Sequence, residues 1–244
     1  MDPLLSLDAI RMSYWRGAHE TVVLDDVSLA VHAGELVAVW GQRGAGKTTL
    51  AMVAAGLERP DSGSVWFDSQ DLAKAPRGQA PQLHHGIGWV QRMGPQSGDF
   101  ESVLDYVALP LLGRNSPRAA RRLATAMLKR LQVSGCAGER WSSLTDGERT
   151  LVALAHALVR EPRLLVADDP TANLDVLQRE EVTGLLRHAA DEQGLGVLIT
   201  VPDMPEVAYA DRVASLSDGR LTVSREPAGD SPNVIDFPGT QRSA

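Results

Sequence analysis

Gly41-Gln42-Arg43-Gly44-Ala45-Gly46-Lys47-Thr48-Thr49 is the stretch that decides the fold of this chain. It fits the pattern G-x-x-x-x-G-K-[S/T] of a phosphate-binding loop. The apolar run before it, Glu35 to Trp40, predicts a buried strand, and the run after it, Thr49 to Ala55, predicts a helix. Because such a loop lies between a strand and a helix, the match is specific.

The composition of the loop suits a bound phosphate and a cation. Its glycines let successive backbone N–H groups turn toward one anion, and the following helix adds the positive end of its dipole. We expect Lys47 to contact the β- and γ-phosphates of a nucleotide and Thr48 to bind Mg²⁺. Asp168 ends an apolar run far downstream, which is where nucleotide hydrolases place the carboxylate that holds this cation.

The overall composition is typical of a soluble globular protein, with 43% hydrophobic and 23% charged residues in 244 positions. A net charge of −7 gives no sign of a nucleic-acid partner. The single cysteine, Cys136, excludes an internal disulfide and fits a reducing compartment. No apolar stretch approaches the ~18 residues that span a bilayer, and no basic-then-apolar run follows Asp2-Pro3 as in a secretory signal.

Strands and helices alternate along the chain, which predicts an α/β fold with a parallel sheet. Besides the strand before the loop, we expect strands at Leu4 to Met12, Val27 to Val31, Ser64 to Phe67, Gly86 to Val90, Arg163 to Ala167, Gly196 to Thr200 and Val213 to Leu216. A helical block from about Asp99 to Arg160 interrupts them, with apolar positions at Val103, Val107, Leu111, Leu123, Met127, Leu128 and Leu131. Another helix is expected from Leu177 to Glu192, and residues 227–244 are expected to be a disordered tail.

Three further segments resemble the ATP-binding cassette (ABC) family: Ser143 to Glu148, Leu151 to Leu158, and Pro162 to Asp175. They match its signature, signature helix, and Walker B strand with D-loop, and the resemblance covers residues 4 to 224. Asp105 to Leu112 and a long loop from Gly17 to Thr21 resemble the lipoprotein-release, macrolide-efflux and cell-division branch. The resemblance implies a P-loop NTPase core in a domain at 1–226, an antiparallel β subdomain, and a helical subdomain inserted at about 92–160.

The resemblance also implies roles for individual residues. Tyr14, or Trp15 as the alternative, would stack on adenine. The phosphates of ATP would be bound by Gly41, Gln42, Arg43, Gly44, Ala45, Gly46, Lys47, Thr48 and Thr49. Thr48, Gln91 and Asp168 would hold Mg²⁺, and Asp169, Gln91 and Lys47 would be catalytic. Thr145 and Gly147 would meet the γ-phosphate bound by an opposite subunit, with Asp175 in the D-loop.

Several positions depart from the family pattern. Asp169 stands where a glutamate orients the attacking water, and one methylene less retracts the carboxylate by about 1.5 Å. Val201 or Asp203 stands where a histidine contacts the γ-phosphate. Asp146 puts a carboxylate into the signature, while Leu151 and His156 replace two arginines. We therefore expect intact ATP binding and weakened hydrolysis, since a misplacement of about 1 Å can cost about 10²-fold in rate.

The sequence favours the ATP-binding subunit of a membrane complex, peripheral on the cytoplasmic face of the membrane. It would dimerise with a second cassette and act on separate transmembrane permease subunits. A non-hydrolysing regulatory cassette is the alternative, and a soluble ABC protein of DNA repair or translation fits least. A basic stretch at Arg118, Arg121, Arg122, Lys129 and Arg130 is either a solvated helix face or a contact for acidic lipid headgroups or a partner chain. His84-His85 is expected in an exposed loop.

Overall fold

The computed structural model describes residues 2–72, 86–91, 101–202 and 208–224. The expectations for His84-His85, for Asp203, for the start of the helical block and for the tail at 227–244 lie outside the described residues.

A six-stranded sheet forms the centre of the fold, with the strand order β10-β9-β3-β8-β7-β6. Its strands are β3 (Leu36–Trp40), β6 (Ile87–Val90), β7 (Leu164–Asp168), β8 (Gly196–Val201), β9 (Arg212–Ser217) and β10 (Arg220–Ser224). All neighbours are parallel except β9 and β10. β7 and β8 are buried along their whole length, as expected for apolar runs at the centre of a parallel sheet. β10 was not predicted.

A four-stranded antiparallel sheet covers one side of this core, in the order β2-β1-β4-β5. It consists of β1 (Leu5–Arg16), β2 (His19–Val31), β4 (Ser62–Phe67) and β5 (Gln70–Asp71). The long loop expected from Gly17 to Thr21 is wrong: Arg16 pairs with His19 across a two-residue turn. Gly17 makes this turn possible because its φ of 63° lies in the left-handed region.

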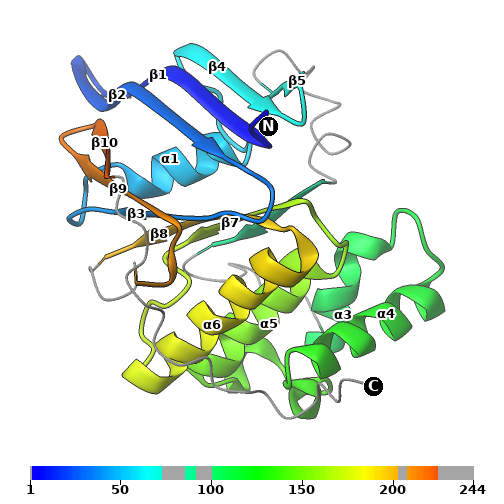
Figure 1. The fold of residues 1–244 in the computed structure, drawn as a ribbon. Coiled ribbons are helices and arrows are strands. Elements are labelled where there is room, and N and C mark those ends of the chain that lie inside the picture. The colour runs from blue at the N-terminus through cyan, green and yellow to red at the C-terminus, as the bar shows by residue number, and fades with distance from the viewer. Residues whose placement is uncertain (1, 73–85, 92–100, 203–207, 225–244) are drawn as a thin grey trace, which may run out of the picture.

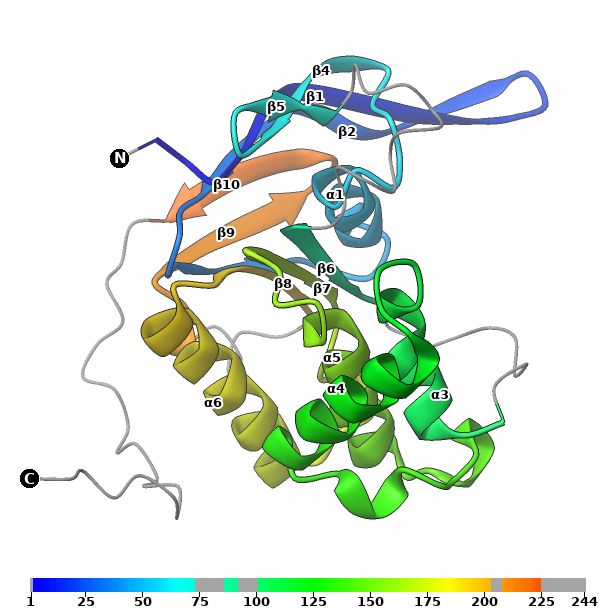
Figure 2. The same ribbon diagram turned by 90° about the vertical axis from the view of Figure 1, so that its right-hand side faces the viewer.

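Helix α1 (Lys47–Ala54) lies between the two sheets, and the remaining helices lie on the other side of the six-stranded sheet (Figure 1). Figure 2 shows the resulting layers from the side. The buried residues of α1 pack against apolar residues of both sheets, including Leu7, Leu24 and Val39. The core therefore fixes α1, and with it the loop that precedes this helix.

The helical block contains α3 (Val103–Ala108), the 3-10 turn η3 (Leu109–Leu111), α4 (Pro117–Arg130) and α5 (Asp146–Leu158). Two more 3-10 turns, Ser134–Cys136 and Trp141–Ser143, connect α4 to α5, and α6 (Val176–Gln193) packs beside them. Ser116 caps α4 by accepting a hydrogen bond from the backbone of Ala119, with Pro117 in the first turn. The expectation that Leu123 belongs to the apolar face is wrong, since this residue is 41% exposed.

An aromatic cluster joins α5 to α3. His156 stacks on Tyr106 with ring centroids 4.3 Å apart, and Tyr106 meets Trp141 edge-on at 5.4 Å. Burial lowers the pKa of His156 to about 4, so the ring stays neutral in the folded protein at neutral pH. His156 thus replaces a charged family residue with a packed neutral ring.

We expect this cluster to make stability depend on pH. The pKa of His156 is about 4 in the folded protein, whereas its ordinary value is 6.5. Between these two pH values the unfolded chain therefore binds a proton at His156 that the folded protein does not. Stability from this residue is complete above pH 6.5 and falls as the pH drops toward 4, by roughly 3 kcal/mol at most. His156→Phe keeps an aromatic ring in the stack and removes the group that binds the proton. Between pH 6.5 and pH 4.5, its free energy of unfolding in urea should therefore fall less than that of the wild type.

The matched control is His188→Phe, because His188 is exposed on α6 and its replacement removes no buried group. Equal pH dependence in the wild type and His156→Phe would contradict the role of His156.

Candidate nucleotide site

The loop from Gly41 to Gly46 connects the carboxyl end of β3 to the first residue of α1. Gly46 caps the helix with a φ of 102°, a conformation that favours glycine. A Cβ at Gly46 would lie 2.7 Å from the carbonyl oxygen of Val23, and one at Gly41 would lie 2.3 Å from that of Leu216. The two glycines therefore let the loop pass close to β2 and β9. The unbonded N–H groups at the start of α1 make this end of the helix suitable for an anion.

Lys47 folds its side chain back over the loop. Its Nζ donates hydrogen bonds to the carbonyl oxygens of Gly41 and Gln42, at 2.5 and 3.1 Å. Its positive charge thus lies beside the loop backbone, where a phosphate would meet both the ammonium group and the N–H groups.

The carboxylate of Asp168 is buried between two hydroxyl groups. Thr48 Oγ1 donates to Asp168 Oδ2 at 2.8 Å, and Thr200 Oγ1 donates to Asp168 Oδ1 at 2.7 Å. Asp168 and Thr200 are register partners on β7 and β8, and Thr48 belongs to the first turn of α1. The structure therefore brings together Thr48 and Asp168, two of the three predicted magnesium ligands, and adds Thr200, whereas the third, Gln91, lines the cavity beside Asp169.

Thr200 is not among the predicted site residues, although the sequence carries a signal for it. It ends the predicted strand Gly196 to Thr200 just as Asp168 ends its own strand, and parallel strands end at the same edge of a sheet.

This oxygen-rich arrangement fits Mg²⁺. Within the described part of the chain, no group of three or more His, Cys, Asp or Glu residues could hold a metal ion. Mg²⁺ needs no such cage, because it keeps several waters and is held by one or two protein oxygens together with substrate phosphates. Thr48 and Asp168 supply the protein oxygens of such a site.

Asp169 follows directly and is held by β8. Its backbone N–H donates to Thr200 Oγ1 at 2.9 Å and to the carbonyl oxygen of Thr200 at 3.1 Å. Its φ of 49° lies in the left-handed region, which Asp tolerates better than most residues. Since the residue is only 7% exposed, its backbone has little freedom to bring the carboxylate forward.

Asp169, Gln91 and Arg43 line one cavity of about 430 Å³. Gln91 directly follows β6, and Arg43 comes from the loop. The opposite wall comes from the helical block and includes Trp141, Asp146 and Arg149. Two of the three predicted catalytic residues, Asp169 and Gln91, thus face the same cavity.

Tyr14 is placed beside α1. Its hydroxyl donates to Glu58, just beyond that helix, and its ring is 41% exposed. Burial, followed by the hydrogen bond to Glu58, raises the pKa of Tyr14, and Thr49 also contacts its hydroxyl. Trp15 is 67% exposed and, as the next residue of β1, points to the opposite face. Tyr14 is thus the better placed of the two candidates for an adenine contact.

Thr145 and Gly147 lie at the start of α5. Thr145 caps the helix in a capping box with Glu148: Oγ1 accepts from the Glu148 N–H at 3.3 Å, and Glu148 Oε2 accepts from the Thr145 N–H at 2.8 Å. A Cβ at Gly147 would lie 2.8 Å from Nε2 of Gln178, which forms a second capping box with Asp175. The predicted signature residues therefore pack against the D-loop helix and line a separate cavity.

The departure at Asp146 is compensated within the same turn. Arg149 Nη1 forms an ion pair with Asp146 Oδ1 at 3.1 Å. The same guanidinium donates to the carbonyl oxygens of Trp141 and Ser142 at 3.4 and 3.3 Å.

Val201 is the last residue of β8, opposite Trp40 of β3, and its side chain is fully buried in the apolar core. It offers no hydrogen-bond donor to a phosphate.

Known proteins share both sequence and fold with this chain. The lipoprotein-releasing system ATP-binding protein LolD of Shewanella denitrificans is 35% identical over 224 residues, which cover 91% of this chain and 95% of LolD. The dimeric structure of MJ0796, a bacterial ABC transporter cassette, has a TM-score of 0.84 and 26% identity, covering 96% of this chain and all of that one. CbiO1 of Clostridium perfringens, part of an ABC transporter complex, has a TM-score of 0.78 and 27% identity, covering 91% and 88% of the two chains.

The family model for the ABC transporter matches residues 24–172, which include the loop, the signature and Asp168. Together with the identity to LolD and the shared fold, this match shows that the chain belongs to the ABC transporter family.

Proposed function

We propose that this chain binds Mg-ATP, pairs with a second cassette, and couples these events to separate transmembrane permease subunits. The observation that carries the proposal is the hydrogen bond from Thr48 to Asp168. This hydrogen bond joins the first turn of α1 to the end of β7. A Mg²⁺ ion bound with the nucleotide would need the hydroxyl oxygen of Thr48 and a carboxylate oxygen of Asp168 at this point.

Each residue of the site has a role in this proposal. Lys47 and the N–H groups of the loop bind the β- and γ-phosphates, and Tyr14 contacts adenine. Thr48 and Asp168 hold Mg²⁺, which neutralises phosphate charge when bound. Thr200 fixes the carboxylate of Asp168 through its second oxygen. Gln91 lies on the cavity between the core and the helical block, where it can respond to both the nucleotide and a permease subunit.

The position of the signature supports a dimer. Thr145 and Gly147 line a cavity that Arg43 and Asp169 do not share, so they are available to a nucleotide held by another cassette. MJ0796, which has the same fold, forms a dimer. In a homodimer each copy would contribute both surfaces, which is an isologous interface.

The relatives support the proposed permease partner and cellular location. LolD is named as the ATP-binding protein of a lipoprotein-releasing system, and CbiO1 as part of a transporter complex. No helix in the described ranges is both long and apolar enough to cross a membrane. We therefore place the chain on the cytoplasmic face of the membrane, attached to separate permease subunits.

We further propose that hydrolysis is slow. Asp169 is one methylene shorter than the usual glutamate, and two hydrogen bonds to Thr200 hold its backbone back. Val201 supplies no donor for the γ-phosphate. These observations also support a second function, an ATP-binding clamp without appreciable turnover that works beside a competent cassette.

Binding is tested by calorimetry with Mg-ATP. We expect a wild-type Kd in the micromolar range, about −8 kcal/mol. Lys47→Ala removes a charged donor and should weaken binding at least about 10²-fold, because hydrogen bonds to charged groups are worth about 1.5–3 kcal/mol each. Lys129→Ala is the control, since Lys129 is exposed on α4. A folded wild type that binds no ATP would overturn the proposed function.

The role of Thr200 is tested by its nearly isosteric replacement. Thr200→Val removes the hydrogen bond to Asp168 and should reduce the gain in ATP affinity that Mg²⁺ provides by about 10-fold. ATP affinity without Mg²⁺ should change little. Thr183→Val, which removes another buried threonine hydroxyl on α6, should leave both affinities unchanged. An equal loss with and without Mg²⁺ would assign Thr200 a purely structural role.

Hydrolysis is tested at Asp169. Asp169→Glu restores the missing reach and should raise the single-turnover rate of the purified chain, by less than about 10²-fold because Val201 still provides no donor. Asp169→Asn keeps the size and removes the charge, so it should lower the rate. A wild type that turns over ATP as fast as ABC cassettes with the usual glutamate would refute slow hydrolysis. If neither the wild type nor Asp169→Glu hydrolyses ATP and both still bind Mg-ATP, the function as a non-hydrolysing clamp is favoured.

A further inference from the structure

One segment of this acidic protein is strongly basic. The 17 residues from Arg114 to Arg130 contain six of the 24 basic residues and no acidic residue, whereas the chain as a whole carries a net charge of −7. The six are Arg114, Arg118, Arg121, Arg122, Lys129 and Arg130, and all of them are exposed. Such a local excess creates a positive field on one part of the surface.

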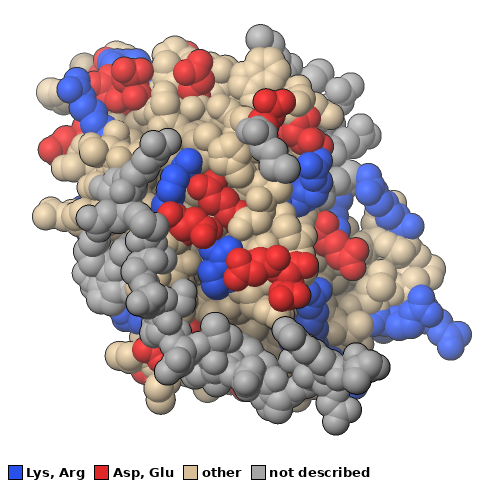
Figure 3. Space-filling view, viewed as in Figure 1, with Lys and Arg blue, Asp and Glu red and all other residues tan. Residues whose placement is uncertain are grey.

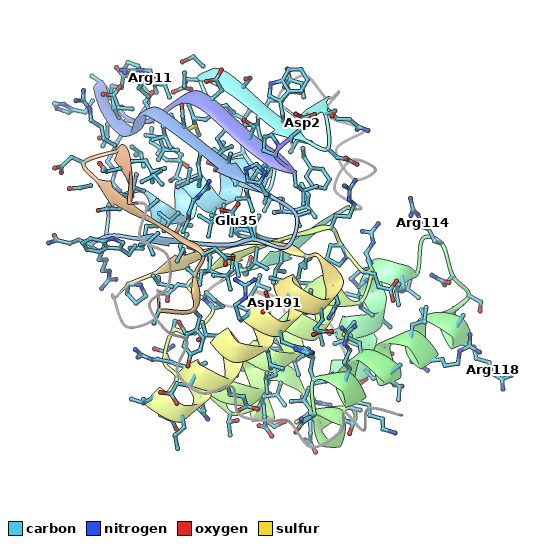
Figure 4. The ribbon with its side chains drawn as sticks, in the orientation of Figure 1. Asp2, Arg11, Glu35, Arg114, Arg118 and Asp191 are labelled. Atoms are coloured by element: carbon cyan, nitrogen blue, oxygen red, sulfur yellow. The ribbon has the colours of Figure 1, made fainter. Side chains whose placement is uncertain are left out.

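The helix collects three of these charges on a single stripe. At about 100° per residue, Arg118, Arg122 and Lys129 project within about 40° of one another around the axis of α4. The opposite side, which includes Ala120 and Leu128, is fully buried against the helical block. Figure 3 shows basic side chains projecting from one end of the molecule, and Figure 4 identifies Arg114 and Arg118 there.

Most of this charge is uncompensated. Among the described residues, Arg121 forms an ion pair with Asp105 at 2.7 Å, and none of the other five forms one. A solvated helix face usually mixes both signs of charge, whereas this face carries only one.

Exposed leucines accompany the charges. Leu112, 46% exposed, lies two residues before Arg114, and Leu123, 41% exposed, directly follows Arg122 in α4, about 100° from it around the helix axis. Basic side chains beside exposed aliphatic ones are typical of surfaces that lie at a membrane interface, where the charged ends reach the headgroups and the apolar groups enter the acyl boundary.

We propose that this region binds the anionic phospholipid headgroups of a membrane leaflet. The α4 surface, as we name it, consists of Leu112, Arg114, Arg118, Arg122, Leu123 and Lys129. A solvent-facing helix with spread-out charges suits a fluid lipid surface, which adapts to the positions of the charges. An acidic peptide would instead need fixed partners, and nucleic acid would gain nothing from the leucines. The binding orients the chain on the membrane and needs no nucleotide.

The test is flotation of the full-length protein with lipid vesicles. Vesicles of phosphatidylcholine that contain about 30% phosphatidylglycerol, enough to give an anionic surface, are compared with vesicles of phosphatidylcholine alone. Both are tested without ATP, at low and at high salt. Each basic residue near an anionic leaflet is worth about five-fold in partitioning, from ~1 kcal/mol each. The wild type should therefore float with anionic vesicles only, and salt should release it.

The triple variant Arg118→Gln/Arg122→Gln/Lys129→Gln should lose about 10²-fold in partitioning. The matched control, Arg16→Gln/Arg140→Gln/Arg220→Gln, changes the net charge equally at other exposed positions and should bind like the wild type. Leu112→Ser/Leu123→Ser should weaken binding with an unchanged salt dependence. The proposal is overturned if the wild type does not bind anionic vesicles, if both triple variants lose binding equally, or if the α4 triple variant loses only its association with permease subunits.

Discussion

The candidate site depends on one buried carboxylate held between two hydroxyl groups. Asp168 accepts from Thr48 on one side and from Thr200 on the other. These contacts tie the phosphate-binding helix to two neighbouring strands of the sheet. A buried polar group is costly unless it is hydrogen-bonded, so the two donors offset the cost of burying this carboxylate. The site is therefore largely formed before any ligand arrives, and a cation that binds there replaces one set of interactions with Asp168 by another.

Around this carboxylate the molecule divides its tasks between two parts. The two sheets and α1 supply the loop, Asp168 and Tyr14, so the core alone can hold a nucleotide. The helical block supplies Thr145 and Gly147, which line another cavity, and Gly147 packs against Gln178 of α6. In the proposed dimer, each chain would contribute one half of two different sites. The same block carries the α4 surface and lines the cavity at Gln91, so the proposed contacts to a membrane and to a partner would fall on one part of the molecule.

Much of this could be predicted from the sequence because the strongest signals are local. The loop pattern predicted β3, the turn and α1, and continuous apolar runs predicted β7 and β8. The lengths of β1 and β2 were harder to predict, because they depend on pairing between the strands. The two strands extend to a tight turn at Gly17 because each provides hydrogen-bond partners for the backbone of the other, which the periodicity of the sequence does not reveal. Leu123 was assigned to the core by its apolar character, yet α4 turns it outward. Thr200 and the pairing of Asp146 with Arg149 depend on side chains that meet only in the folded chain.

Binding and hydrolysis respond differently to substitution, and this difference explains how such a site can keep one and weaken the other. Phosphate binding rests on backbone N–H groups, a helix dipole and one ammonium group, and these contributions vary gradually with distance. Hydrolysis requires one carboxylate oxygen to reach one water, so a shift of about 1 Å matters. At Asp169 the left-handed backbone and the hydrogen bonds to Thr200 keep the shorter side chain from recovering that distance. Thr200 thus contacts both the carboxylate of Asp168 and the backbone of Asp169, which links the proposed cation site to the proposed slow hydrolysis.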